Sequence, residues 1–180
     1  MAVRRMCDLV VLPKGDAPMA RVRDIVDAMT ALSHGAPQRH RRIARLLANA
    51  LEAAAGNQWY AAIGCVLRLQ DDPLCDRRPD VFIYRAETID ISPTRPEHVL
   101  MVIEVISPGS ETTDREIKLD QYAQAGIQFY WRVEQAMTDV PIIYTYSLDM
   151  ASDAYRDTEI FSGVVNMTVP FPATIDLATI

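Results

Sequence analysis

The run VLMVIEVI, at positions 99–106, constrains the fold of this chain more than any other stretch. Seven of its eight side chains are apolar, which is typical of a central strand covered on both faces of a sheet. The segment SPGSETTDREIKLDQYAQAG follows, in which a Ser or Thr near the start can cap a helix that ends at Gly126. After this helix we expect the segment IQFYWRV to form the next strand. Strand, helix and strand in this order predict a βαβ unit, with the strands at 99–106 and 128–133 parallel neighbours or nearly so.

Further elements flank this unit on both sides. Residues 37–55, PQRHRRIARLLANALEAAA, place apolar side chains along one stripe, as an amphipathic helix requires. The segments WYAAIGCVLRL and PDVFIY are typical of strands, and PIIYTYSL, DTEIF and VVNMTVPF indicate an antiparallel extension at the C-terminal end. RVRDIVDAMTAL fits either a short helix or an irregular pair of strands.

Length and composition limit the class of protein. A chain of 180 residues with 49% hydrophobic side chains can bury one good core, so we expect a single domain over residues 1–180. No segment combines the features of a secretory signal, and no apolar run approaches the roughly 18 residues that span a bilayer. We therefore expect a cytoplasmic protein with no membrane segment.

The charge pattern restricts how the protein could bind nucleic acid. The net charge of -6 has the wrong sign for binding through bulk electrostatics, so only local basic clusters could contact phosphates. A solvated helix face is the alternative role for the first of these clusters. The candidate nucleic-acid-binding residues are Arg39, Arg41, Arg42 and Arg45 in the helix segment, and Arg77 with Arg78.

Glu104 is the one charged residue inside the apolar run, and a carboxylate there is costly to bury without a partner. Asp80 opens the strand PDVFIY, and the two carboxylates converge at one sheet edge if their strands are adjacent. Such a pair suits Mg²⁺ or Mn²⁺. On the following helix Asp114, Lys118 and Tyr122 are spaced by four residues and share one face, so Lys118 can reach Glu104. These groups could perform metal-assisted phosphodiester hydrolysis, or Glu104 and Lys118 could form a structural ion pair.

Three short motifs carry a family resemblance. Over residues 20–135 the chain resembles the Uma-two family of restriction endonucleases, a branch of the PD-(D/E)XK nuclease-like superfamily. Members of that family resemble one another in an EV-SP strand end, a D-(x)3-K-(x)3-Y helix and a GV-x-EYW strand. Here the motifs are Glu104-Val105 with Ser107-Pro108, then Asp114, Lys118 and Tyr122, and then Gly126-Ile127 with Tyr130-Trp131.

The resemblance implies an α/β fold with a mixed sheet and flanking helices, in which a restriction-endonuclease-like core at about residues 20–135 carries the antiparallel C-terminal extension. It implies metal ligands in Asp80, Glu104 and the backbone carbonyl of Val105. The superfamily's lysine two residues after the glutamate is Ile106 here, and the family pattern moves that role to Lys118.

The resemblance also suggests auxiliary residues near the site. Asp24 stands where the family's YELIDGEL-like segment has its first glutamate. His40 could contact the site or a phosphate, with an ordinary surface position as the alternative. Tyr122 could pack over the site, donate to Glu104 or to a phosphate, or simply pack its helix, and Asp114 shares its helix face.

The expected function is a homodimeric, Mg²⁺-dependent or Mn²⁺-dependent endonuclease that hydrolyses phosphodiester bonds in DNA. Two alternatives remain open from the sequence. One is a non-catalytic binding or scaffold protein that retains the nuclease fold. The other is a metal-dependent phosphodiesterase that acts on RNA or on a small phosphate-containing substrate.

Overall fold

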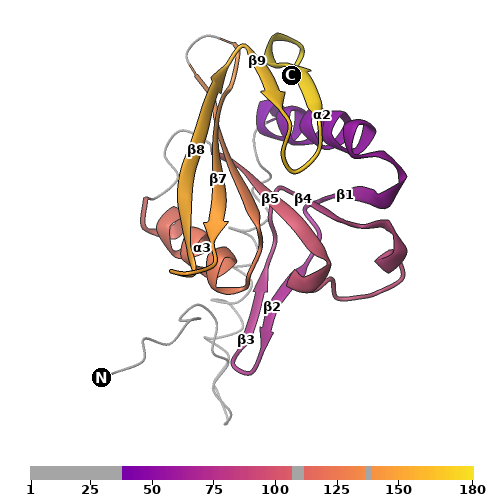
Figure 1. Ribbon diagram of the computed structural model, residues 1–180, viewed down its shortest axis with the longest axis vertical. Coiled ribbons are helices and arrows are strands. Elements are labelled where there is room, and N and C mark those ends of the chain that lie inside the picture. Colours follow the sequence, from indigo (N-terminus) through magenta and orange to yellow (C-terminus); the bar gives the residue numbers. More distant parts are fainter. Residues whose placement is uncertain (1–37, 107–111, 137–138) are drawn as a thin grey trace, which may run out of the picture.

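A six-stranded mixed sheet forms the centre of the described part of the molecule (Figure 1). The computed structural model describes residues 38–106, 112–136 and 139–180, with the backbone alone for residues 112–115. The strand order is β1-β4-β5-β6-β7-β8, and neighbouring strands are antiparallel except for the parallel pair β5 and β6. These strands are β1 (Trp59–Ile63), β4 (Val81–Arg85), β5 (Val99–Ile106), β6 (Phe129–Glu134), β7 (Ile142–Asp149) and β8 (Ala154–Ser162).

The predicted βαβ unit is confirmed. Strand β5 runs parallel to β6, with Ile103 opposite Trp131, and helix α3 (Thr112–Gln124) connects them. Gly126 follows the helix with a φ of +79°, a left-handed conformation that glycine adopts without steric cost. The residues predicted to cap the start of this helix lie outside the described side chains.

Helices α2 and α3 cover opposite faces of the sheet. The predicted helix at 37–55 is confirmed as α2 (Gln38–Ala55), whose apolar stripe includes Ile43, Leu47 and Leu51 and packs on β1, β4 and β5. On the other face Tyr122 of α3 packs with Phe82, Val102 and Tyr130. The sheet therefore has a core layer on each side, and a side chain on β5 faces one layer or the other.

The segment WYAAIGCVLRL was predicted as one strand, and this prediction is wrong. The chain leaves the large sheet at Gly64, whose φ is +59° and whose N–H donates to the carbonyl of Asp80 at 3.1 Å. The second half then forms β2 (Leu67–Asp71), which pairs with β3 (Leu74–Arg77) in a separate hairpin. The positive φ explains the break, because it turns the backbone out of the extended ladder.

The antiparallel C-terminal extension is confirmed in β7 and β8. The segment VVNMTVPF forms a strand only over β9 (Val164–Met167), which pairs with β10 (Ala173–Asp176) in a small second sheet next to α2. Strand β10 was not predicted from the sequence. RVRDIVDAMTAL, with Asp24, lies outside the described residues, and no helix within them is long and apolar enough to cross a membrane.

Candidate active site

Asp80 and Glu104 lie opposite one another on neighbouring strands. In the antiparallel pair of β4 and β5, Val81 is the partner of Ile103. Continuing that register by one residue places Asp80 across from Glu104. Directly opposed residues project to the same side, with Cβ atoms roughly 4.5–5.5 Å apart. The backbone therefore brings the two predicted carboxylates together, where β4 begins and β5 nears its end.

Asp80 is held by groups from two other elements. Its Oδ2 atom accepts a hydrogen bond from the backbone N–H of Val105 at 2.8 Å, and its Oδ1 atom lies 2.8 Å from Nε2 of His40. An ionised carboxylate only accepts, so Nε2 of His40 donates. His40 is 9% exposed, which rules out the ordinary surface position. These two contacts fix both oxygens of Asp80.

The burial of His40 was visible in the helix pattern. His40 precedes Ile43, Ala44 and Leu47 by three, four and seven residues, the spacing of one helix face. A polar side chain on an apolar stripe costs free energy to bury unless it has a hydrogen-bond partner. The sequence thus contained the signal that His40 is buried, but not the identity of its partner 40 residues away.

Glu104 is held by two side chains of α3. It is 6% exposed, and its Oε1 atom accepts a hydrogen bond from the phenol of Tyr122 at 2.8 Å. Nζ of Lys118 lies 3.8 Å from the same oxygen, at ion-pair distance, with the Lys118 side chain 28% exposed. Lys118 and Tyr122 reach one oxygen together because residues four apart share a helix face. The side chain of Asp114, predicted on the same face, lies outside the described part of the chain.

Tyr122 remains a hydrogen-bond donor across the working pH range of an enzyme. Burial, and next to it the negative charge of Glu104, raises the pKa of the Tyr122 phenol well above its usual value. The phenol therefore keeps its proton and donates to Glu104. The charge of Glu104 is compensated by this donor and by the Lys118 ammonium.

Gln121 is a site-adjacent residue that the sequence analysis missed. It is 3% exposed on α3, next to Tyr122, and its Oε1 atom accepts a hydrogen bond from Nε of Arg77 at 2.7 Å. Arg77 was predicted as a nucleic-acid contact, and its guanidinium instead ties β3 to α3. The pairing spans 44 residues, so helix or strand periodicity gave no signal for it.

The donor set near Asp80 and Glu104 fits a hard divalent cation. Within the described residues no group of three or more His, Cys, Asp and Glu side chains is arranged around a metal position. Mg²⁺ does not need such a cage, because it keeps several waters and is usually held by one or two carboxylates. Asp80 and Glu104, opposed on β4 and β5, are such a pair of carboxylates.

The arginines of α2 divide into paired and solvent-facing side chains. Arg39 forms an ion pair with Asp139 at 3.1 Å, and Arg42 donates to the carbonyl of Ile180. Arg41 and Arg45 are exposed, and so is Arg78 near the start of β4. Arg42 is exposed as well, but its guanidinium already donates to Ile180, so of the predicted phosphate-contacting arginines Arg41, Arg45 and Arg78 are best placed to meet a ligand.

Comparisons with known proteins identify relatives of the chain. The Uma2 family, described as "Putative restriction endonuclease", matches residues 9–179. A crystal structure of "a putative nuclease belonging to DUF820" from Anabaena variabilis has a similar fold, with a TM-score of 0.57 and 15% sequence identity. The match covers 80% of this chain and 81% of that one. No curated protein matches the sequence.

Proposed function

Because the chain belongs to the Uma2 family of restriction-endonuclease-like proteins, we propose that it hydrolyses phosphodiester bonds in DNA with the help of a divalent cation. The observation that carries this proposal is the register of β4 and β5, which sets Asp80 opposite Glu104. The ion pair of Glu104 with Lys118 adds a cation at the same place. Two carboxylates and an ammonium are the groups that metal-assisted phosphodiester hydrolysis uses.

Asp80 and Glu104 would hold Mg²⁺ or Mn²⁺ together with the backbone carbonyl of Val105. When bound, such an ion polarises the phosphate and lowers the pKa of a bound water. His40 and the N–H of Val105 fix the Asp80 carboxylate, and Tyr122 fixes that of Glu104. These contacts preorganise the two carboxylates before any substrate arrives.

Lys118 is the residue best placed to act on the reacting phosphate. Its ammonium lies beside the buried Glu104, and part of its side chain reaches solvent. From that position it can orient the attacking water or offset the negative charge that develops on the phosphoryl oxygens. The conformational freedom of a lysine suits such a movable point charge.

DNA would be bound through local positive charge, since the chain as a whole is acidic. Arg41, Arg45 and Arg78 supply exposed cations. Phosphate contacts of this kind position the backbone and carry no sequence information. Cleavage of both strands of a duplex calls for two active sites, and we propose a homodimer, to be checked by analytical ultracentrifugation. An edge of the large sheet, β8, is a candidate contact.

The decisive experiment is nicking of supercoiled plasmid by the purified chain with Mg²⁺, Mn²⁺ or EDTA. We expect metal-dependent nicking that falls by more than about a hundredfold in Glu104→Gln, Asp80→Asn and Lys118→Ala. Glu116→Gln is the matched control, because it makes the same chemical change at an exposed carboxylate of α3. It should retain full activity.

The same preparations separate the alternatives. Cleavage of RNA or of a small phosphodiester in place of DNA, with the same dependence on Glu104, would keep the metal site and replace the substrate. Absence of turnover on every substrate, with a melting temperature that neither metal changes, would contradict the proposal. Glu104 and Lys118 would then be a structural ion pair in a non-catalytic protein that retains the fold.

A further inference from the structure

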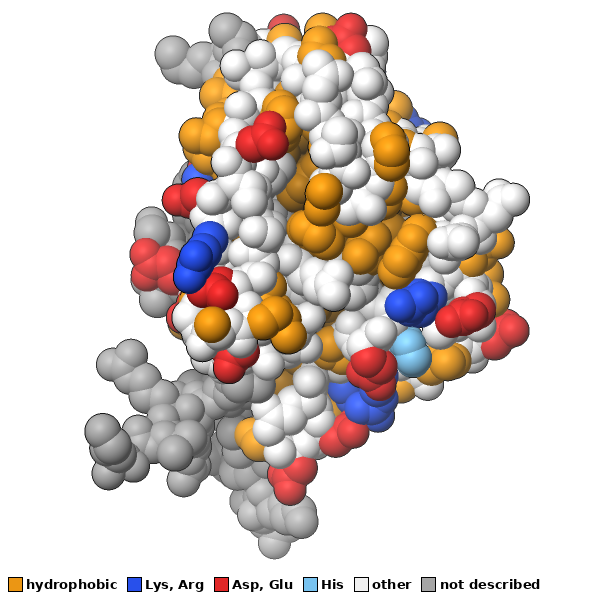
Figure 2. Space-filling view, viewed as in Figure 1, with side chains coloured by type: hydrophobic (Ala, Val, Ile, Leu, Met, Phe, Trp, Pro, Cys, Tyr) orange, Lys and Arg blue, Asp and Glu red, His pale blue; other side chains and the backbone are white. Residues whose placement is uncertain are grey.

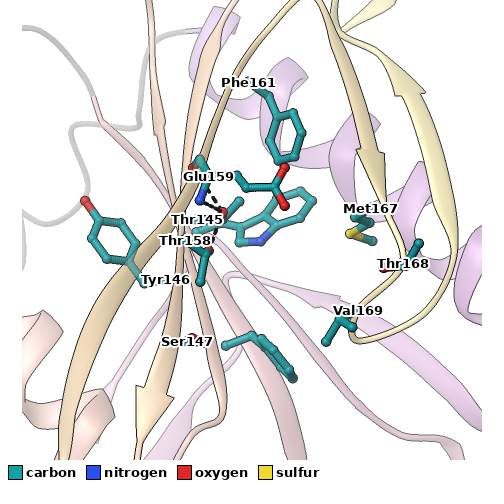
Figure 3. A pocket seen from close by; sticks show the side chains of 11 residues that line it. Thr145, Tyr146, Ser147, Thr158, Glu159, Phe161, Met167, Thr168 and Val169 are labelled. Carbon is teal, nitrogen blue, oxygen red and sulfur yellow. Dashed lines mark hydrogen bonds between the residues drawn. The ribbon is translucent and has the colours of Figure 1, made fainter.

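A cavity of about 230 Å³ lies on the α2 side of the sheet, away from Glu104. It opens between β6, β7 and β8 and the loop after β9 (Figure 3). Trp131 in its wall belongs to the core layer under α2. Tyr146, from the layer under α3, also lines the cavity, but Glu104, Tyr122 and Tyr130 are not among its lining residues. The cavity is therefore separate from the candidate active site.

The walls of this cavity are mainly apolar. Side chains that line it include Phe129, Trp131, Phe161, Met167 and Val169. Val169 is 64% exposed, and Figure 2 shows apolar side chains gathered on the surface between β8 and β9. Rings and a thioether offer broad contact to an apolar or aromatic ligand. Among the described residues no Lys, Arg or His lines the cavity, so none of these lining residues compensates the charge of an anion.

Two threonines at the cavity use their hydroxyls within the protein. Oγ1 of Thr145 lies 2.7 Å from Oγ1 of Thr158, and it also accepts a hydrogen bond from the N–H of Glu159 at 3.0 Å. The pairing of β7 with β8 shifts register between Tyr144 and Tyr146, which sets Thr158 and Glu159 off the regular ladder. The irregularity thus anchors the backbone of Glu159 beside the cavity.

Of the lining residues that the structure describes, Glu159 alone carries a carboxylate. Its side chain extends from β8 into the cavity, near the ring of Phe161 (Figure 3). Within the described part of the chain its carboxylate has no ion pair or hydrogen bond. A single negative charge at the mouth of an aromatic hollow is complementary to a positive charge carried on an apolar body.

We propose that this cavity binds a compact organic cation, with its ammonium against Glu159 and its apolar part against Trp131 and Phe161. The volume is below the roughly 300–1,000 Å³ of sites for drug-sized ligands, so the ligand is small. The site lies on the other face of the sheet from Glu104, and the proposal is independent of the proposed nuclease activity.

Calorimetric titration of the full chain with three probes that share a phenethyl group tests this proposal. They are the phenethylammonium ion, neutral 2-phenylethanol and anionic 3-phenylpropionate. We expect the cation to bind at least about tenfold more tightly than the alcohol, and the anion more weakly than both. Glu159→Gln should remove the preference for the cation. Asp157→Asn, which makes the same change of charge on the same strand, should keep it.

Three results would each overturn the proposal. The first is that phenethylammonium does not bind, or binds no better than 2-phenylethanol. The second is that Glu159→Gln leaves the preference intact. The third is that Asp157→Asn removes the preference as fully as Glu159→Gln, since the effect would then come from net surface charge. Plasmid nicking plays no part in these readouts, so failure of the nuclease proposal leaves them interpretable.

Discussion

The two faces of the central sheet carry different kinds of side chain, although the same strands build both. On β5, Met101, Ile103 and Val105 face the layer under α2, whereas Val102 and Glu104 face the layer under α3. The α2 layer is predominantly aliphatic. The α3 layer is built around tyrosines, with Tyr122, Tyr130 and Tyr146 buried and further tyrosines packed against them.

This difference means that one face mainly stabilises the fold, whereas the other holds the polar groups of the candidate site. Aliphatic burial is non-directional, so the α2 layer can stabilise the fold without fixing any one polar atom. In the α3 layer the buried Tyr122 donates to Glu104, and the partly buried Tyr155 donates to the carbonyl of Ile127. Directional contacts of this kind can hold a carboxylate in place. The candidate site lies where the two layers meet, since His40 comes from α2.

Truncation of the aliphatic layer should give the largest loss of stability. Ile103→Ala, at a fully buried position, should lower the free energy of unfolding by about 2–5 kcal/mol in urea denaturation. Nicking per folded molecule should change little. Ile160→Ala, at a position that is 67% exposed, is the control and should be nearly neutral. Complete loss of nicking in a folded Ile103→Ala protein would break the separation between the two faces.

The tyrosine layer should respond differently to the loss of one hydroxyl. Tyr122→Phe leaves Glu104 buried without its phenol donor, which should cost about 1–3 kcal/mol and reduce nicking. Tyr155→Phe is the control, because it removes a partly buried phenol that donates to the carbonyl of Ile127, away from the site. It should cost similar stability and leave nicking unchanged. Equal nicking by both variants would assign Tyr122 a purely structural role.

Local patterns in the sequence predicted most of the fold. A nearly continuous apolar run identified the strand at 99–106, the βαβ order placed the strand at 128–133 beside it, and an apolar stripe identified the helix at 37–55. The patterns failed at Gly64, where a positive φ ends the strand, and at β10, which is four residues long. Short elements that pair outside the main sheet carry too few residues to show a period.

The site was predictable in its residue types and less so in its contacts. Glu104 was conspicuous because it interrupts an apolar run, and spacing by four brought Lys118 and Tyr122 to it. The contact of His40 with Asp80 and that of Arg77 with Gln121 join residues 40 and 44 positions apart. Contacts over such separations depend on how helices sit on the sheet, which no local pattern records.

Alkaline pH should weaken the tyrosine layer selectively. Burial, followed by the charge of Glu104, raises the pKa of Tyr130 above its usual value, and burial together with Glu104 does the same for Tyr122. The folded state keeps these protons while the unfolded state loses them above about pH 10. The stabilisation is therefore complete below pH 10 and falls as pH rises, by roughly 1 kcal/mol per tyrosine and pH unit.

Urea denaturation between pH 9 and 11 measures this slope. Tyr130→Phe should show a shallower fall of unfolding free energy with pH than the unaltered chain. Ile103→Ala removes core packing but no ionisable group. Its free energy of unfolding should therefore be lower at every pH and fall with the same slope as that of the unaltered chain. A slope that Tyr130→Phe does not change would mean that the alkaline sensitivity lies outside this layer.

The smallest effects should come from the solvent side of α2. Arg41→Gln with Arg45→Gln removes two exposed cations while the apolar stripe of the helix stays on the sheet. Anisotropy of a labelled DNA duplex in EDTA, measured over a range of salt concentrations, should show weaker binding and a log–log salt slope reduced by about 2. Arg156 lies in β8, the strand at the other end of the strand order from β1. Arg156→Gln should leave that slope unchanged. If the double variant binds like the unaltered chain, the arginines of α2 form a solvated face, and substrate contact must come from the tyrosine side, where Lys118 lies.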